Sequence, residues 1–375
     1  MIFPKPIFEE YGDGTYTLKK YLKGLTLVEL YAEYKNGNED LKLKKVSGMI
    51  EDEYNLTIDE NGILVEYSFE NGVFRAVSSL KQLIHKCGEK LPFAKICDKP
   101  DFKKRSYMLD ISRGRIPKVE FIEKLIDLLS DLKYNEFQLY MENFCYKFPE
   151  FPQFTENFDC LTPEDMVHLD KYCRERFIDL VPNQNCFGHM ATWLATEELS
   201  YLEIGDENTK TGTINILHPD TIKVVEKIFD SVLPYFSSEY VNIGLDEAYG
   251  LGRFQLEEIC KEKGNARVFM DYLNQVADLI RTKYGKKVMF WSDMVYDAKD
   301  EFELIPPGAY ALNWGYDERK TVMMERRCMA LLEKGIPYYI CPGTANWVAF
   351  TGRYDVMWLN VQSCAEMGRR HGAEG

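Results

Sequence analysis

The adjacent carboxylates Asp246 and Glu247 are the two residues of this chain best placed for acid–base chemistry. They end an apolar run, Tyr240–Leu245, and a glycine-containing loop follows them, which is typical of a buried parallel strand and its C-terminal loop. Side chains alternate along a strand, but two neighbours can turn toward one pocket where the strand breaks into a loop. Two acids after one strand are also common at a protein surface. The catalytic interpretation therefore depends on the residues at the ends of the other strands.

Other apolar runs end in polar or aromatic residues in the same way. In chain order, these strand-end residues are Asp110 and Arg113, then Tyr140, Glu142 and Asn143, then His189, and, beyond the acidic pair, Trp291, Asp293, Trp314 and Trp347. Aromatic platforms combined with hydrogen-bonding groups suit a pyranose, whose C–H face is apolar and whose hydroxyls bind edge-on. The pattern indicates a sugar-binding pocket at one edge of a sheet.

Strands and helices alternate from residue 101 to residue 375. The candidate strands are Tyr107–Ile111, Glu136–Met141, Phe177–Val181, Tyr240–Leu245, Lys287–Trp291, Ala309–Trp314 and Tyr338–Cys341. This alternation, with helical patterns such as Val119–Leu132 between the strands, predicts an α/β fold, a (β/α)₈ TIM-type barrel. Only seven strands are found, and the chain stops at His371–Gly375, where the eighth should begin. We expect a chain truncated before the last barrel strand; a seven-stranded open barrel is the alternative.

Residues 1–100 predict a separate small α+β domain. Short strands are expected at Leu41–Leu43, Tyr54–Ile58 and Ile63–Phe69, separated by Asn-Gly turn signals. An amphipathic helix is expected at Gly72–Lys86. The charged segment Ile96–Lys104, which contains a proline, is the predicted boundary.

Composition limits the classes of partner. The net charge of −14 argues against nucleic acid, and no apolar stretch is long enough to span a membrane. Ten cysteines are scattered without a compact Cys/His cluster, which argues against structural zinc. The N-terminus shows no export-signal pattern, so reduced thiols and a cytoplasmic protein are expected. The oligomeric state stays open.

Four motifs together resemble one known family. They are DISRGRIP, KYNEFQLYMEN, LVPNQNCFGHM and NIGLDEAYGLG, and their order and approximate spacing are similar to those of the β-N-acetylhexosaminidases of glycoside hydrolase family 20. Those enzymes carry a D-x-x-R motif, a K-x-N strand, a P-G-H-like loop and a G-x-D-E motif. The front domain, with its GVFRAVSSLKQLI helix, resembles the small α+β domain that precedes their barrel. The resemblance covers essentially the whole chain.

The resemblance implies a role for each strand-end residue. Glu247 matches the general acid/base, and Asp246 matches the acid that orients and polarises the 2-acetamido group of the substrate. Arg113 matches the arginine that grips the outer hydroxyls of the sugar. The other expected substrate-binding residues are the loop histidine His189, the acetamido-pocket walls Trp291 and Trp314, the candidate sugar platform Trp347, and Tyr140 and Asn143 after strand two.

The implied reaction releases terminal GlcNAc or GalNAc from an oligosaccharide with retention of configuration. The carbonyl oxygen of the 2-acetamido group attacks the anomeric carbon, so the enzyme supplies no nucleophile. Asp246 stays ionised, whereas Glu247 starts protonated. We therefore expect burial and the neighbouring carboxylate to raise the pKa of Glu247. No metal or cofactor is needed.

The chain also departs from the family pattern. The common P-E-x-D before the Gly-His is Pro182-Asn183-Gln184-Asn185 here, so amides replace two acids, and an expected aspartate is Asn143. The strand-eight Trp-x-Glu of the family would lie beyond Gly375. A divergent subgroup is indicated, and preferences for GlcNAc or GalNAc, linkage and aglycone stay open.

Other interpretations remain. A retaining glycosidase on sugars without an acetamido group would need a nucleophile about 5–5.5 Å from the acid, for which Asp293 or Glu142 are candidates. A non-catalytic sugar-binding barrel would keep the pocket without turnover. Individually, Arg113 could only pair with Asp110, His189 could only support its loop, and the strand tryptophans could be core residues. Asp293 could be only a partner of site residues or a helix N-cap.

Overall fold

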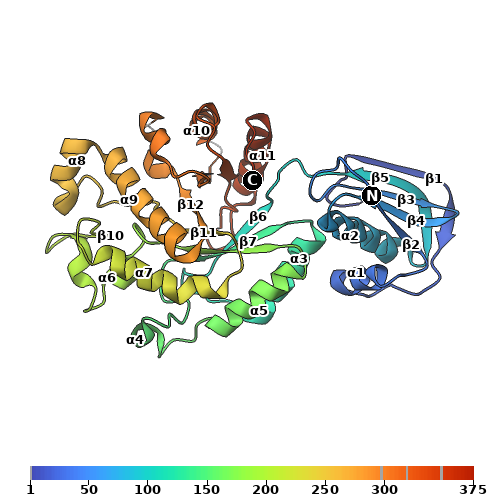
Figure 1. Ribbon diagram of the computed structural model, residues 1–375, viewed down its shortest axis with the longest axis horizontal. Coiled ribbons are helices and arrows are strands. Elements are labelled where there is room, and N and C mark those ends of the chain that lie inside the picture. The colour runs from blue at the N-terminus through green and yellow to red at the C-terminus, as the bar shows by residue number, and fades with distance from the viewer. Residues whose placement is uncertain (1, 296–298, 318–319, 347–348) are drawn as a thin grey trace. The chain divides into compact units, whose positions relative to one another are not determined.

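The computed structural model describes residues 2–295, 299–317, 320–346 and 349–375 (Figure 1). The chain folds into two compact units. Unit 1 contains Met1–Tyr107, Glu120–Phe137 and Lys171–Asp179, and unit 2 contains Met108–Val119, Gln138–Asp170 and Leu180–Gly375. Across the described ranges, no helix combines the length and apolar composition needed to cross a membrane.

Unit 1 is built around a five-stranded sheet with the order β1-β5-β3-β4-β2. Its elements are β1 (Phe8–Thr17), α1 (Leu27–Lys35), β2 (Leu41–Lys45), β3 (Tyr54–Asp59), β4 (Gly62–Tyr67), α2 (Glu70–Cys87) and β5 (Lys90–Asp98). Strand β2 runs parallel to β4, and the other pairs are antiparallel. Helix α2 packs against β3, β4 and β5, burying Val73, Phe74, Val77 and Leu80 completely. This apolar face explains why an amphipathic helix was predicted here.

Two strands of this sheet were not predicted. Strand β1 exposes almost every residue on both faces, so its sequence lacks the apolar alternation that identifies a strand. Strand β5 carries Pro92 near its start and extends to Asp98, into the segment predicted as a boundary. The two strands predicted on either side of the Asn61-Gly62 turn signal are present as β3 and β4, which pair antiparallel with Asp59 opposite Gly62.

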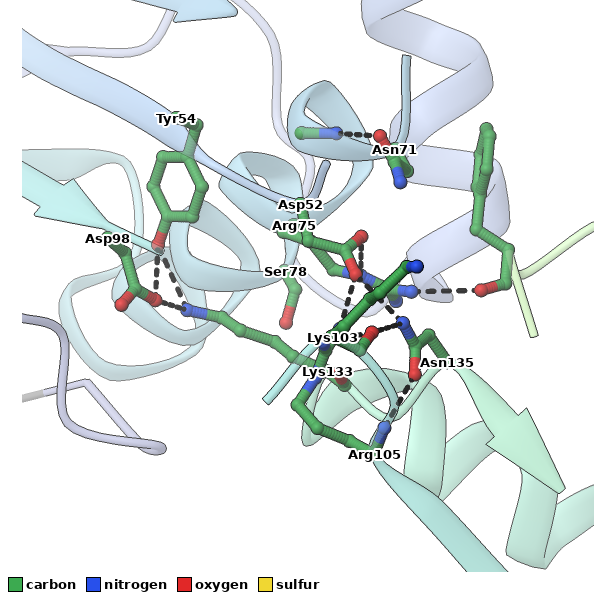
Figure 2. A network of polar contacts seen from close by, with 12 residues as sticks. Asp52, Tyr54, Asn71, Arg75, Ser78, Asp98, Lys103, Arg105, Lys133 and Asn135 are labelled. Carbon is green, nitrogen blue, oxygen red and sulfur yellow. Dashed lines mark hydrogen bonds and ion pairs between the residues drawn. The ribbon is translucent and has the colours of Figure 1, made fainter. Parts of the chain in front are cut away.

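A buried polar network lies inside unit 1 (Figure 2). The Nε–H of Arg75 donates to Asp52 Oδ1 at 2.9 Å, and Arg105 bonds the other oxygen of Asp52. In a second part of the network, Lys133 Nζ donates to Asp98 Oδ2 at 2.7 Å and to the Tyr54 hydroxyl at 2.9 Å. Each buried acid of the network therefore has a cation in contact.

One parallel sheet of seven strands carries the second half of the fold, in the order β6-β7-β8-β11-β12-β13-β14. Its strands are β6 (Ser106–Asp110), β7 (Glu136–Met141), β8 (Asp179–Gln184), β11 (Tyr240–Asn242), β12 (Lys287–Trp291), β13 (Tyr310–Trp314) and β14 (Tyr338–Cys341). Strand order follows chain order, and helices lie between the strands, as in a TIM-type barrel. The fold prediction is confirmed, with β6 and β14 as the two edges among the described residues.

The connections between these strands contain helices and one small hairpin. The helices are α3 (Val119–Asp131), α4 (Pro152–Thr155), α5 (Pro163–Arg174), α6 (Ala191–Leu194), α7 (Thr221–Val232), α8 (Glu257–Lys263), α9 (Asn265–Leu279), α10 (Thr321–Glu333) and α11 (Tyr354–Arg370), and the hairpin is β9 (Glu203–Gly205) with β10 (Lys210–Ile214). Short 3₁₀ or π turns lie at Ser200–Leu202, Leu233–Tyr235, Phe254–Leu256, Ile280–Tyr284, Asp293–Val295 and Lys299–Leu304.

Two strand boundaries differ from the prediction in ways that matter for the site. Strand β8 starts two residues later than predicted and continues through Asn183 and Gln184, which are completely buried rather than in a loop. Asn183 pairs with Asn242 of β11 in the parallel register, so the amide lies within the sheet. Strand β11 ends at Asn242, three residues earlier than predicted, which leaves the residues before Asp246 free to turn.

The last two residues lie against the edge strand β14. The Glu374 N–H donates to Tyr338 O at 3.0 Å, and the Ile340 N–H donates to Gly375 O at 2.9 Å. Alternate backbone groups of β14 are thus paired with residues 374 and 375, as a further parallel strand would pair with them. This is the position at which strand eight of the barrel is expected.

Candidate active site

The acidic pair lies in a tightly turned loop after β11. Leu245 and Glu247 have positive φ angles of +76° and +47°, in the left-handed region that residues with a side chain seldom occupy. The loop after β8 presses against this turn, because a Cβ added to Gly188 would lie 2.1 Å from the Asp246 carbonyl oxygen. The side chains of Asp246 and Glu247 are 13% and 34% exposed. Both carboxylates are therefore held in a strained turn and partly sheltered from water.

His189 joins the acidic pair to a third carboxylate. Its Nε2 lies 3.2 Å from Asp246 Oδ2 and 3.3 Å from Glu247 Oε2, and its Nδ1 lies 3.2 Å from Glu142 Oε2. His189 itself has a φ of +55°, which turns its ring toward the other loops. The structure thus brings together ends of β7, β8 and β11 around one imidazole.

Electrostatics place the proton on His189 rather than on Glu247. Burial alone would lower the pKa of His189, but hydrogen bonds to Asp246 and Glu247 raise it to about 10. The same hydrogen bond from His189 is the main reason that the pKa of Glu247 is lowered, against the opposing effect of burial. The expectation of a raised pKa for Glu247 is therefore wrong for this arrangement. That expectation considered the effects of burial and of the neighbouring acid on the pKa of Glu247, but not the effect of a protonated imidazole.

Arg113 lies beside the histidine cluster. Its guanidinium donates to Asp110 at 2.8 Å and lies 3.0 Å from Glu142, over the ring of Tyr140. The Tyr140 hydroxyl donates to the same Glu142 oxygen at 2.8 Å. Arg113 is half exposed, so its pairing with Asp110 does not bury it. It can reach solvent and a ligand while Glu142 fixes its direction.

Asp293 supports the pair from the next strand end. It lies in the 3₁₀ turn after β12, where one oxygen accepts the Glu247 N–H at 3.0 Å and the other accepts the Trp314 indole N–H at 3.2 Å. Burial, with the charge of Asp246, raises the pKa of Asp293 to about 7. The ring of Tyr316 packs against Trp314 at 5.0 Å. Asp293 is thus a partner of site residues, one of the roles left open by the sequence.

The remaining predicted site residues lie in different surroundings. Trp291 is only 5% exposed and packs with Met289 and Leu312 in an apolar cluster, and its indole N–H has no hydrogen-bond partner within the part of the chain that the structure describes. The Asn143 side-chain amide donates to the Ser112 carbonyl. Trp347 lies outside the described residues.

Two residues near the pair were not given a role from sequence. Asn185 donates to Asp246, and Tyr249 hydrogen-bonds the Glu247 carboxylate. Asn185 was noted from sequence only as a departure from the family motif, and for Tyr249 the sequence offered only its place two residues after Glu247. Among residues that the structure describes, no cluster of three His, Cys, Asp or Glu side chains forms a candidate metal site.

Two family models match this chain. The model of the glycosyl hydrolase family 20 catalytic domain matches residues 102–372, and the model of domain 2 of the same family matches residues 9–99.

Individual relatives are distant. A β-hexosaminidase of Vibrio furnissii is 24% identical over 301 residues, covering 70% of this chain and 49% of the relative. A lacto-N-biosidase of Bifidobacterium bifidum is 22% identical, covering 69% of this chain and 24% of the relative. The crystal structure of a β-N-acetylhexosaminidase from Bacteroides fragilis superposes with a TM-score of 0.76 at 21% identity, covering 96% of this chain and 79% of that one. The chain thus spans about half the length, or less, of these two curated relatives.

Proposed function

The chain belongs to glycosyl hydrolase family 20, and on that premise we propose that it is an exo-acting β-N-acetylhexosaminidase that removes terminal GlcNAc or GalNAc by substrate-assisted hydrolysis. One observation carries the proposal. Asp246 and Glu247 lie side by side at the carboxyl edge of the parallel sheet, and one imidazole contacts both of them. This edge is where the active sites of such barrels form.

In the first step, Glu247 donates its proton to the glycosidic oxygen, and the bond from that oxygen to the anomeric carbon breaks. The carbonyl oxygen of the 2-acetamido group forms a new bond to the anomeric carbon, giving a cyclic oxazolinium ion. Asp246 accepts a hydrogen bond from the amide N–H as positive charge develops there. In the second step, water attacks the anomeric carbon, Glu247 takes the water proton, and the ring opens. Two inversions leave the configuration retained.

The pKa values constrain when this cycle can run. Since the hydrogen bond from His189 lowers the pKa of Glu247, the acid form needed for the first step is favoured at acidic pH. We therefore infer an acidic optimum for kcat/KM. The protonated His189 balances part of the charge of the two carboxylates throughout the cycle.

The substrate contacts are part of the proposal. Half-exposed Arg113 would bind the outer hydroxyls, and Trp314, which Asp293 holds in place, would form a wall of the acetamido pocket. Tyr140 and Asn143 would act through the Glu142 and Ser112 groups that they bond. We keep Trp291 as a further wall of the acetamido pocket and Trp347 as a sugar platform.

The test compares hydrolysis of an aryl N-acetyl-β-glucosaminide with that of the matching aryl β-glucoside. We expect cleavage of the acetamido substrate alone and a large loss of that activity in Glu247→Gln. Equal cleavage of both sugars would refute substrate assistance and favour a glycosidase with its own nucleophile. If saturation-transfer NMR detects N-acetylglucosamine binding and no cleavage occurs, the chain is a sugar-binding protein.

We also propose a cytoplasmic location. All ten cysteines are free thiols, and seven of them are buried, which suits a reducing compartment. Recovery of the native protein from the culture medium would contradict this assignment.

A further inference from the structure

Asn185 is the residue after β8, and both the nitrogen and the oxygen of its side-chain amide form hydrogen bonds. Its Nδ2 donates to Asp246 Oδ1 at 2.7 Å, while its Oδ1 accepts the backbone N–H groups of Cys186 at 3.1 Å and Leu245 at 3.0 Å. Two N–H donors point at one end, so that end must be the oxygen, and the orientation of the amide is determined. Asn185 is completely buried.

The loop before Asp246 is shaped around this side chain. A Cβ added to Gly244 would lie 2.3 Å from Asn185 Oδ1, and Gly244 has a φ of +73°. A side chain at 244 would therefore collide with Asn185 and strain the backbone. Asn185 thus connects the loop after β8 to the loop after β11. It lies beside Gly244 and Leu245, the two residues that precede Asp246.

We propose that Asn185 is a positioning residue that fixes the direction of the acetamido-binding Asp246 through a donor that carries no charge. The inference rests on the proposed function and deepens it. An amide donates a hydrogen bond at any pH, whereas a carboxyl group at this position, as in the P-E-x-D pattern of the family, donates only while it carries a proton. This chain therefore holds Asp246 without placing another titratable group beside it.

The surroundings explain why a neutral donor matters here. The other oxygen of Asp246 faces His189, which it shares with Glu247. Asp293 adds another buried acid that senses the charge of Asp246. Tyr140 and Tyr316 also interact electrostatically with Asp246, and both are neutral phenols at ordinary pH. Among the residues that the structure describes, His189 is thus the cation in contact with Asp246, and an additional negative charge at position 185 would find no counter-ion of its own there.

The variant Asn185→Asp tests the proposal with almost no change of shape. One oxygen keeps both backbone N–H groups, but the other bonds Asp246 only when a proton lies between the two carboxyls. We expect kcat/KM for the acetamido substrate to approach that of the parent chain near pH 4.5 and to fall at least 10-fold below it by pH 7. Asn185→Ser, which loses the donor without adding a charge, should show a deficit that does not change with pH.

Asn183→Asp is the matched control. Asn183 is equally buried and lies two residues earlier, on β8, but its side-chain amide donates to Gln138 at 3.0 Å and makes no bond to Asp246. This control should lose stability while the pH profile of kcat/KM keeps the parent shape. A profile of Asn185→Asp that parallels the parent or the control would overturn the positioning role.

A double-mutant cycle keeps this test separate from the proposed function. The unfolding free energy lost through Asn185→Asp at pH 7 should be smaller in an Asp246→Asn background, because the repelling carboxylate is gone. An equal loss in both backgrounds would refute the pairing, whether or not the chain has activity. Absence of acetamido selectivity in the parent chain would instead refute the proposed function.

Discussion

Two polar clusters of this molecule, one largely buried and one partly exposed, use charge in opposite ways. In unit 1, Arg75 and Arg105 both contact Asp52, and Lys133 contacts Asp98, so cations outnumber the acids they bind (Figure 2). At the strand ends of unit 2, one imidazole contacts three carboxylates, those of Glu142, Asp246 and Glu247, and Arg113 reaches only the first of them.

This difference in the ratio of cations to carboxylates indicates that the cluster of unit 1 stabilises the fold, whereas the cluster of unit 2 is suited to acid–base chemistry. Paired charges in unit 1 leave each acid fully compensated, and burial makes the loss of either partner costly. In unit 2, three carboxylates share one imidazole, and burial raises the pKa of Glu142 while the hydrogen bond from His189 lowers that of Glu247, a separation of the kind that acid–base catalysis requires. Four substitutions test this contrast, from the largest expected effect to the smallest.

Glu247→Gln should reduce kcat/KM for the aryl N-acetyl-β-glucosaminide by about 10²–10⁴-fold, because it removes the proton donor of the first step. Steady-state kinetics at the pH optimum measure the loss. The free energy of unfolding should change by less than about 1 kcal/mol, since the side chain is one-third exposed. A fully active variant would remove Glu247 from the mechanism.

Asp52→Asn should lower the free energy of unfolding by about 3–5 kcal/mol, because it leaves two arginines without their counter-ion in a buried site. Urea unfolding followed by circular dichroism measures this change. The matched control is Asp131→Asn, which breaks the partly exposed pair with Lys81 in the same unit and should cost at most about 1 kcal/mol. Similar losses for both variants would contradict the distinction between the clusters.

His189→Gln should show a stability loss that depends on pH. The folded pKa of His189 is raised to about 10, against about 6.5 when unfolded, so its ion pairs stabilise fully below pH 6.5 and are lost as pH rises through 10. The difference in unfolding free energy between parent and variant should be about 1.5–3 kcal/mol at pH 6 and smaller at pH 10. A difference that grows with pH would show that His189 is neutral in the fold.

Tyr249→Phe should have the smallest effect. The Tyr249 hydroxyl contributes to the lowered pKa of Glu247, after the larger contribution of His189. Its removal should raise the pKa of Glu247 and move the alkaline limb of the kcat/KM profile to higher pH, with less than about a 5-fold change at the optimum. The limb of a Tyr201→Phe control, whose hydroxyl faces Asp220, should stay in place. A shift to lower pH would contradict the assignment of Glu247 as the acid.

The strand-end residues could be predicted from sequence because parallel strands bring their carboxyl ends to one edge of a sheet. That rule needs only the order of apolar runs, and it places Arg113, His189, Asp246 and Glu247 together. It could not give the proton distribution, because the pKa of Glu247 depends on a histidine turned by its positive φ angle.

Other features escaped prediction for related physical reasons. Strand β1 is an edge strand exposed on both faces, so the hydrophobic pattern that identifies strands is missing from it. Asn185 was recognised only as a departure from a motif, since its bonds to Leu245 and Asp246 depend on how two distant loops approach each other. For Trp291, sequence could name a packed position only as an alternative, because its contacts depend on residues of neighbouring strands that sequence spacing does not specify.

The central claim is that the 2-acetamido group of the substrate is the nucleophile and that Asp246 and Glu247 serve it. A series of aryl N-acyl-β-glucosaminides whose acetyl methyl carries none to three fluorines tests this most directly, because each fluorine withdraws electrons from the attacking carbonyl oxygen. We predict that log kcat falls steeply and continuously along the series, with the slope altered in Asp246→Asn. A rate that does not depend on the number of fluorines would contradict participation of the acetamido group and, with it, the proposed mechanism.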